Sequence, residues 1–266
     1  MDLQLKGKRA LVTGGSRGIG LACARQLARE GCSVMLAARD AEALKTAAAS
    51  ITEETGAQVT CRVVDTASDA SVKAMVRAAS EQLGGADILV NAAAKVAGQS
   101  APPRLAEITD ALFWDDVNVK VMGYLRCARE VAPLMMAQGW GRIVNISGLA
   151  ARNTGSAIGS IRNVGVAALT KNLADELGPH GINATCVHPG LTRTEKTAPL
   201  VAARAAAAGK TPEEIETGMA SSTILGRLVT AEEVADVVAF LASPRSVSIN
   251  GDAIAVGGGT RGSIYY

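Results

Sequence analysis

Short apolar runs alternate with longer alanine-rich stretches along almost the whole chain, and this alternation constrains the fold more than any other feature. The apolar runs predict seven strands, at 9–14, 33–39, 59–65, 87–91, 142–147, 182–189 and 252–256. Most are apolar almost throughout, as is typical of strands covered on both faces. The intervening stretches predict helices near 18–30, 40–55, 68–83, 110–137, 156–178 and 231–242. The pattern predicts an α/β fold: a doubly wound parallel sheet of about seven strands, with right-handed crossovers and helices on both faces.

No linker rich in Pro, Gly or Ser divides the 266 residues, so we expect a single domain over 1–266. The least regular segment is 191–225, which predicts two small helices outside the sheet. We interpret this segment as a substrate lid, because such segments are commonly mobile; a surface insertion is the alternative.

Composition limits the classes of partner. Hydrophobic residues make up 48% of the chain and charged residues 20%, which suits a packed core. The net charge of +2 gives no reason to expect nucleic acid. No run resembles a signal peptide or is apolar and long enough to span a membrane. The cysteines are scattered without a C-x-x-C pair, which favours buried thiols in a reducing cytoplasm over disulfides or a metal site. They are Cys23, Cys32, Cys61, Cys127 and Cys186.

A glycine-rich loop, "TGGSRGIG" at 13–20, lies between the first predicted strand and the first predicted helix. Glycine permits positive φ angles and a close backbone approach to a diphosphate, and the helix N-terminus offers free N–H groups to it. The loop therefore predicts a dinucleotide site, with a tight turn alone as the alternative. The residues expected to bind there are Gly14, Ser16, Arg17, Gly18, Ile19 and Gly20.

The end of the second predicted strand bears on which dinucleotide binds. Ala38 stands where enzymes that prefer NAD usually carry an acidic residue for the ribose hydroxyls. Arg39 follows, and Arg17 lies in the glycine loop, so two guanidinium groups could hold the 2′-phosphate of NADP. Asp40 could be the missing acid under a shift of one or two residues. We favour NADP(H) over NAD(H).

Several further motifs, in order along the chain, resemble the short-chain dehydrogenase/reductase family. They include "DILVNAAA" at 87–94, "NVKVMGY" at 118–124, "GRIVNIS" at 141–147 and "ALTKNLADELGPHGINATCVHPG" at 168–190. The resemblance covers nearly the whole chain. It implies a single Rossmann-type domain, a nicotinamide dinucleotide, a small-molecule substrate and a homo-oligomer, either a tetramer or a dimer.

The same resemblance assigns further cofactor contacts. Asp65 would bond the adenine amine, and the residues around 91–93 would line the cofactor, although the family's usual Asn-Asn-Ala-Gly reads "VNAAA" here. The nicotinamide end and the phosphates would be held by residues in 189–194. The residues implied are Asn91, Ala92, Ala93, Pro189, Gly190, Thr192 and Thr194.

The family's chemistry normally uses Asn, Ser, Tyr and Lys, in which Tyr exchanges a proton with the substrate oxygen and Lys lowers the tyrosine pKa. Asn118 matches the Asn, and Ser147 matches the Ser if a gap is allowed; these two are the predicted catalytic residues. Gly159 and Asn163 stand at the Tyr and Lys positions, so the chain lacks the Tyr-x-x-x-Lys motif. Asn163 could still hydrogen-bond a ribose hydroxyl and so contact the cofactor.

Few residues could supply the proton instead. Lys95 is a candidate if it faces the cleft, whereas Lys120 is discounted, because on a helix it would point to a different face from Asn118. His188 lies at a strand's carboxyl end, where ligands bind in this architecture. Ser160 is a further candidate, and Tyr265 or Tyr266 could enter a neighbouring subunit's cleft. Arg162 could anchor a carboxylate or phosphate substrate, or lie on the solvent face.

The sequence thus predicts an NADP(H)-dependent short-chain oxidoreductase that acts on a small organic substrate with a divergent active site. One alternative is a dinucleotide-binding regulatory or scaffold protein without redox turnover, because the usual acid and its lysine are missing. A lyase or isomerase on the same scaffold is a third hypothesis, which the intact glycine loop disfavours.

Overall fold

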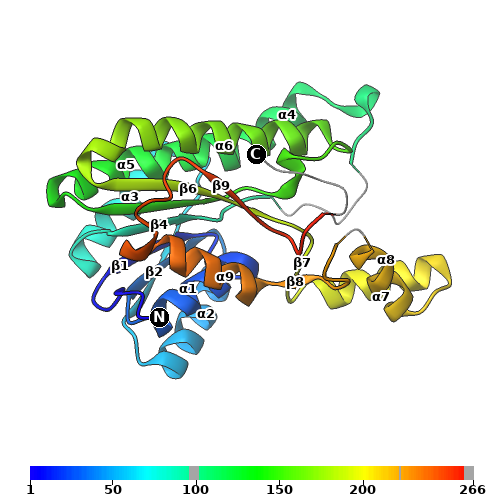
Figure 1. The fold of residues 1–266 in the computed structure, drawn as a ribbon, viewed down its shortest axis with the longest axis horizontal. Helices are drawn as coiled ribbons and strands as arrows, with labels where there is room; N and C mark the ends of the chain where they lie inside the picture. The colour runs from blue at the N-terminus through cyan, green and yellow to red at the C-terminus, as the bar shows by residue number, and fades with distance from the viewer. Residues whose placement is uncertain (96–101, 222, 261–266) are drawn as a thin grey trace.

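The computed structural model describes residues 1–95, 102–221 and 223–260. Seven parallel strands within them form one sheet in the order β3-β2-β1-β4-β5-β6-β9 (Figure 1). Their bounds are β1 Arg9–Thr13, β2 Ser33–Ala38, β3 Val59–Val63, β4 Ile88–Asn91, β5 Gly141–Ile146, β6 Ile182–Pro189 and β9 Ala253–Val256. All seven predicted strands are present, which confirms the predicted α/β sheet.

Helices cover both faces of this sheet, in two layers (Figure 1). Neighbouring residues on β1 show why its apolar sequence is continuous: Val12 packs into one core cluster with Leu27, and Leu11 packs into the other with Met135. Successive side chains on a strand point to opposite faces, so a strand covered on both sides needs apolar residues at every position. The first layer holds α1 Gly18–Arg29, α2 Ala41–Thr55 and α9 Ala231–Leu241; the second holds α3 Asp69–Leu83, α5 Gly123–Gln138 and α6 Ala157–Leu177.

The segment predicted as one helix over 110–137 is divided in the structure. It begins as α4 (Asp110–Val117), continues as a π-helical turn, η2 (Asn118–Met122), and ends as α5. A π turn spends more residues per revolution than an α-helix, so it changes which side chains share a face, and such turns are frequent at functional sites. Short 3₁₀ turns are η1 Leu105–Glu107, η3 Leu149–Ala151, η4 Gly178–His180 and η5 Pro244–Ser246.

Two small helices lie outside the main sheet, as the sequence predicts for 191–225. They are α7 (Thr197–Ala208) and α8 (Pro212–Ala220), and they project beside the sheet end in Figure 1. The short strands β7 (Thr192–Arg193) and β8 (Val229–Thr230) pair on either side of them and anchor both ends of the segment. Their role as a lid stays a prediction.

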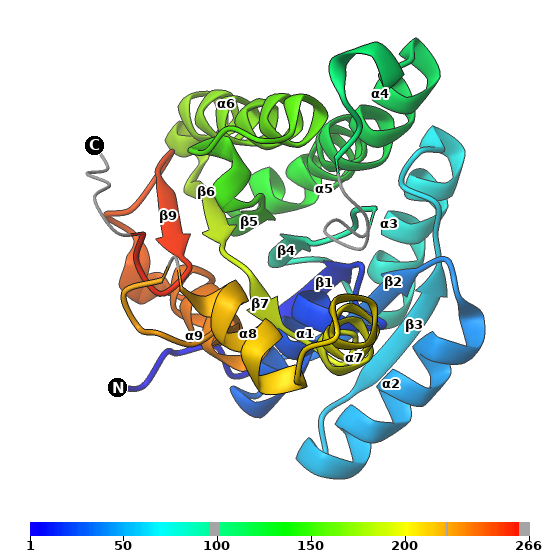
Figure 2. The same cartoon turned by 90° about the vertical axis from the view of Figure 1, so that its right-hand side faces the viewer.

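The strand order fixes where a ligand can bind. β1 lies between β2 and β4, so the chain winds in opposite directions on its two sides, and a crevice opens at the carboxyl ends of these strands. Figure 2 looks onto that end, with α7 and α8 nearest the viewer. None of the helices in the described part of the chain is both long enough and apolar enough to cross a membrane.

Candidate active site

A cavity of about 1250 Å³ opens at the carboxyl ends of the strands, between the main sheet and α7. The glycine loop lines one end, and the start of α6 with the end of β5 lines the other. All but one of the residues predicted to bind the cofactor line this cavity. They are Gly14, Ser16, Arg17, Gly18, Ile19, Gly20, Arg39, Asp65, Ala92, Ala93, Asn163, Pro189, Gly190, Thr192 and Thr194.

The glycine loop has no room for side chains at two positions. Gly14 has a φ of +70°, and a Cβ there would come within 2.7 Å of the Ala92 carbonyl oxygen. A Cβ on Gly20 would collide with the Gly14 carbonyl. The bare backbone lets α1 begin directly beneath the cavity. The loop therefore has the form needed for close approach of a diphosphate to backbone N–H groups.

An acidic side chain already lies at the start of α1. The Gly18 N–H donates a hydrogen bond of 3.1 Å to Oε2 of Glu195, from the segment before α7. This carboxylate shows that the helix N-terminus accepts an anion where the dinucleotide phosphates are expected. The residues present thus fit a dinucleotide.

The groups that would distinguish NADP from NAD lie at the edge of the cavity. Arg17 and Arg39 both line it and are exposed to solvent. Asp40, the alternative ribose-binding acid, instead caps α2, because its Oδ1 accepts the Ala43 N–H at 3.1 Å. A carboxylate used as a cap is less available to a ribose, which favours the arginine interpretation.

Asn91 is the one predicted cofactor residue that does not line the cavity. It is fully buried, and its Nδ2 donates to Oδ1 of Asn145 at 2.9 Å. Asn145 in turn donates to Oγ1 of Thr170 on α6 at 3.0 Å. This chain of hydrogen bonds ties β4 and β5 to α6. Asn91 therefore helps to hold β4, β5 and α6 together and does not itself face the cavity.

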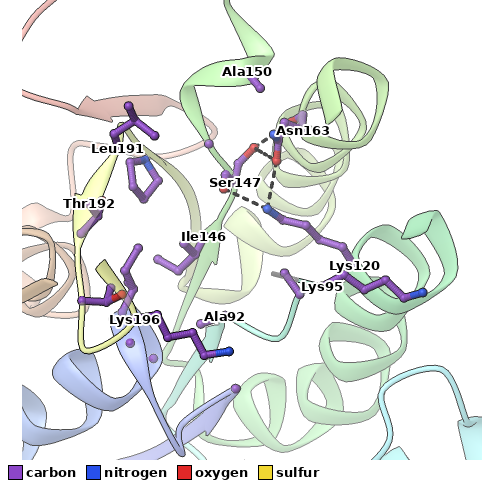
Figure 3. Close-up of a pocket in the computed structure, with 18 of the residues that line it drawn as sticks. Ala92, Lys95, Lys120, Ile146, Ser147, Ala150, Asn163, Leu191, Thr192 and Lys196 are labelled. Atoms are coloured by element: carbon purple, nitrogen blue, oxygen red, sulfur yellow. Dashed lines mark hydrogen bonds between the residues drawn. The ribbon is translucent and has the colours of Figure 1, made fainter. Parts of the chain in front are cut away.

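The expectation that Lys120 points away from the site is wrong. Lys120, in the π turn, lines the cavity and is 4% exposed. Its Nζ donates to the Ser147 carbonyl oxygen and to Oδ1 of Asn163, both at 2.9 Å (Figure 3). The side chains of Asn118 and Lys120 do face different ways, but Lys120 is the one that enters the cavity.

Asn118 points the other way. Its Oδ1 accepts a hydrogen bond of 2.8 Å from Nη2 of Arg126 on α5, eight residues further along the chain, and its side chain does not line the cavity. A catalytic role for Asn118 stays a prediction, and this geometry does not favour it.

Ser147 lies at the end of β5 and is 7% exposed in the cavity wall. Its Oγ donates to the Asn163 carbonyl oxygen at 2.9 Å, so the hydroxyl proton is engaged with α6. The Ser147 carbonyl oxygen accepts from Lys120. Ser147 therefore connects the lysine and α6, and its catalytic role stays a prediction.

The charge balance around Lys120 disfavours its ammonium form. Burial, and secondarily the positive charge of Arg162, lower the pKa of Lys120 to about 7. Asp116 acts in the opposite direction, but its carboxylate is bound by Nη1 of Arg162 at 2.6 and 2.8 Å. The amine therefore changes its charge near neutral pH, which is uncommon for lysine.

The other predicted substitutes for the tyrosine occupy less suitable positions. Lys95 lines the cavity but forms an ion pair with Asp115. His188 is buried within β6 and does not line the cavity; burial, then the charge of Arg152, lower its pKa to about 4. Ser160 donates its hydroxyl to the Asn153 carbonyl oxygen at 2.9 Å.

The tyrosines offer no phenol to this cavity within the described residues. Tyr124 is fully buried, and its hydroxyl donates to the Ile146 carbonyl oxygen at 2.9 Å. Burial raises the pKa of this phenol well above its usual value. Gly159, at the family's tyrosine position, does not line the cavity. Tyr265 and Tyr266 lie outside the described residues.

Fold and site together define a Rossmann-type α/β protein whose cavity, beside the glycine loop, fits a dinucleotide. The family model described as enoyl-(acyl carrier protein) reductase matches residues 14–261. The short-chain reductase protein NovJ of Streptomyces niveus is 36% identical over 252 residues, which cover 94% of this chain and 92% of that protein. The 3-oxoacyl-[acyl-carrier-protein] reductase FabG of Pseudomonas aeruginosa is 35% identical, covering 97% of this chain and 98% of that protein.

Solved structures agree with these relatives. L-sorbose reductase from Gluconobacter frateurii, complexed with NADPH and L-sorbose, superposes with a TM-score of 0.92 at 31% identity, covering 99% of this chain and 100% of that chain. The chain belongs to the short-chain dehydrogenase/reductase family and is one of its oxidoreductases.

Proposed function

We propose that this protein is an NADP(H)-dependent reductase of carbonyl groups in small organic molecules, with a divergent proton donor. The observation that carries the proposal is the cavity itself. A bare glycine loop and two arginines lie at one end, and a buried lysine of low pKa lies at the other. One ligand can reach both ends only if it is long, as a dinucleotide is.

The bound cofactor would supply a hydride, and the chain's own residues would do the rest. Gly14 and Gly18 would bring backbone against the diphosphate, and Arg17 and Arg39 would hold the 2′-phosphate. Asp65, which lies on the cavity wall, would receive the adenine amine. Pro189 and Gly190, at the end of β6, would shape the nicotinamide end.

Relatives support a carbonyl substrate. One solved neighbour is named as binding L-sorbose with NADPH, and several sequence relatives are named 3-oxoacyl-[acyl-carrier-protein] reductases. Here the outer part of the cavity is lined by apolar side chains of the 191–225 segment, including Leu200 and Met219. Leu191 is 52% exposed at its rim. A ketone with an apolar part suits this lining, with α7 and α8 closing over it as a lid.

We also propose that the protein works in the cytoplasm as a homo-oligomer, a tetramer or a dimer. Its five cysteines are free thiols, and four of them are buried, which suits a reducing compartment. Size-exclusion chromatography with light scattering tests the oligomeric state.

A dinucleotide-binding protein without turnover remains the second candidate, because Gly159 and Asn163 stand at the two positions that normally hold the acid and its lysine. Two measurements on the wild-type protein separate the candidates. A melting-temperature series with NADPH, NADP, NADH and NAD reports binding and preference through mass action. NADPH oxidation is then followed with L-sorbose, acetoacetyl-coenzyme A and a cyclic diketone.

We expect NADPH to raise the melting temperature most, and at least one carbonyl probe to oxidise it. Binding of NADPH with no turnover across the panel would favour the second candidate. An unchanged melting temperature with all four nucleotides would contradict both.

A further inference from the structure

Reduction of a carbonyl needs a proton as well as a hydride, and the described residues bring no phenol to the cavity to supply it. Among the described residues, the acid is then another group that lines the cavity and can release a proton at working pH. Two other cations that line the cavity are already engaged: Lys95 forms an ion pair with Asp115, and Arg162 forms one with Asp116.

Lys120 meets the geometric requirement. It reaches the cavity from the π turn, and its Nζ contacts two segments that carry catalytic residues in the family. One is the end of β5, through the Ser147 carbonyl, and the other is Asn163, which stands at the family's lysine position (Figure 3). An ammonium group has three N–H bonds, and those two acceptors use two of them, so one N–H remains for a substrate oxygen.

Hydrogen bonds position the Lys120 amine, but no carboxylate bonded to it stabilises its charged form. Its two acceptors are neutral oxygens, so no carboxylate bonds it directly. The charged or titratable groups that interact with it are Arg162 on α6, Asp116 on α4, and Cys186 and His188 on β6. Arg162 forms an ion pair with Asp116, which offsets part of its positive charge. Burial raises the pKa of Cys186 to about 11 and lowers the pKa of His188 to about 4, so both side chains are neutral near pH 7.

We propose that Lys120 is the catalytic proton donor of this enzyme and takes over, from a different helix, the work of the missing tyrosine. The inference rests on the proposed carbonyl reduction. As the hydride forms the new C–H bond, the π electrons of the carbonyl move to its oxygen, and that oxygen takes a proton from the Lys120 ammonium. The products are an alcohol, the oxidised nicotinamide nucleotide and a neutral amine. The amine regains its proton from water that enters the cavity.

Two variants separate proton donation from a structural or purely electrostatic role. Lys120→Met keeps the apolar stem and removes the amine, and it should lower kcat by about 10² to 10⁴-fold, the usual contribution of a general acid. It should retain an NADPH-induced rise in melting temperature, which shows an intact fold and cofactor site. Lys120→Arg keeps a positive charge but not a releasable proton, so it should not rescue kcat.

The pH profile gives a second readout. Reduction needs the ammonium form, so kcat should be high below neutral pH and fall as pH rises through about 7. Asn163→Asp places a carboxylate beside the amine, raises its pKa and should move this fall to higher pH by about one pH unit or more. Lys95→Met, which removes a different cavity lysine, should leave the fall where it is.

A third readout needs neither cofactor nor substrate. Competitive acetylation of the cofactor-free protein with acetic anhydride, followed by mass spectrometry, measures the pKa of each lysine amine. Lys120 should titrate several pH units below the surface lysines in the wild-type protein, and higher in Asn163→Asp.

The outcomes are distinguishable from failure of the proposed function. If none of the carbonyl probes supports NADPH oxidation by the wild-type protein, the proposed function fails, and this inference fails with it. If the wild-type protein is active and Lys120→Met retains kcat within tenfold, or Lys120→Arg restores it, then Lys120 is not the donor. An ordinary lysine pKa in the labelling experiment would overturn it as well.

Discussion

The two ends of the cavity are built in different ways. At the glycine loop, one short segment, 14–20, lines the cavity and leaves room for a diphosphate because its glycines carry no side chains. At the other end, Lys120, Ser147 and Asn163 come from the π turn, β5 and α6, and side chains and carbonyls make the contacts. The first end depends on the absence of side chains, and the second depends on three elements packing in one arrangement. A local motif can therefore describe the loop of the first end, and it cannot describe the second end.

Gly14→Ala tests the first end and should have the largest effect. The new Cβ would lie 2.7 Å from the Ala92 carbonyl oxygen, so the loop must move away from the site of the diphosphate. We expect the NADPH-induced rise in melting temperature to disappear. Gly139→Ala is the matched control, because its φ of +69° imposes the same backbone strain with nothing within 4 Å.

Both alanine variants should lose about 1–2 kcal/mol of unfolding free energy from the left-handed backbone conformation. Only Gly14→Ala should lose NADPH binding. If the two variants bind NADPH equally well, the close approach at Gly14 is not part of the cofactor site.

Arg39→Ala should have the next largest effect. Loss of one charge-assisted hydrogen bond at an exposed position should weaken NADPH binding by about tenfold and leave NADH binding unchanged. Isothermal titration of both nucleotides measures this, with the exposed Arg62→Ala on β3 as control. Equal losses for the two nucleotides would show that Arg39 does not read the 2′-phosphate.

Glu195→Gln should act in the opposite direction. The Glu195 carboxylate bonds the Gly18 N–H, where it competes with a diphosphate for the start of α1. Removing its charge should strengthen NADPH binding by about two- to fivefold, the usual size of a charge effect at a helix N-terminus. Glu213→Gln, in the first turn of α8, is the control. Weaker binding in Glu195→Gln would mean that the carboxylate supports the site.

Asp40→Ala should leave cofactor preference unaffected. Loss of the α2 cap should lower the free energy of unfolding by about 1 kcal/mol, measured by urea denaturation. The ratio of NADPH to NADH affinity should not change. A selective loss of NADH binding would identify Asp40 as a ribose-binding acid and contradict the preference for NADP.

Much of the molecule follows from local patterns. All seven strands of the main sheet lie where continuous apolar runs predict them, because strands such as β1 need apolar residues on both faces. The glycine-loop residues line the cavity because glycine spacing records a backbone requirement, and their contact with the cofactor stays a prediction. Asn91 was placed among the cofactor residues by resemblance alone, and it instead bonds Asn145.

The proton-donor end was not predictable in this way. The segment 110–137 has a helical pattern, and α-helical periodicity gives no sign of the π turn at Asn118–Met122. The premise that Asn118 and Lys120 face different directions is correct, but it does not say which of them faces the cavity. The useful signal was chemical: a chain that has lost one lysine from a site carries another nearby.

By itself the sequence determined the α/β sheet, the glycine loop and the loss of the Tyr-x-x-x-Lys motif, because each of these is a property of residues close together in the chain. Only the tertiary structure decided that Lys120 enters the cavity and that Asn118 turns to Arg126. Those positions depend on how the π turn packs between β5 and α6. The low pKa of the lysine has the same origin, since burial is a property of the packed molecule.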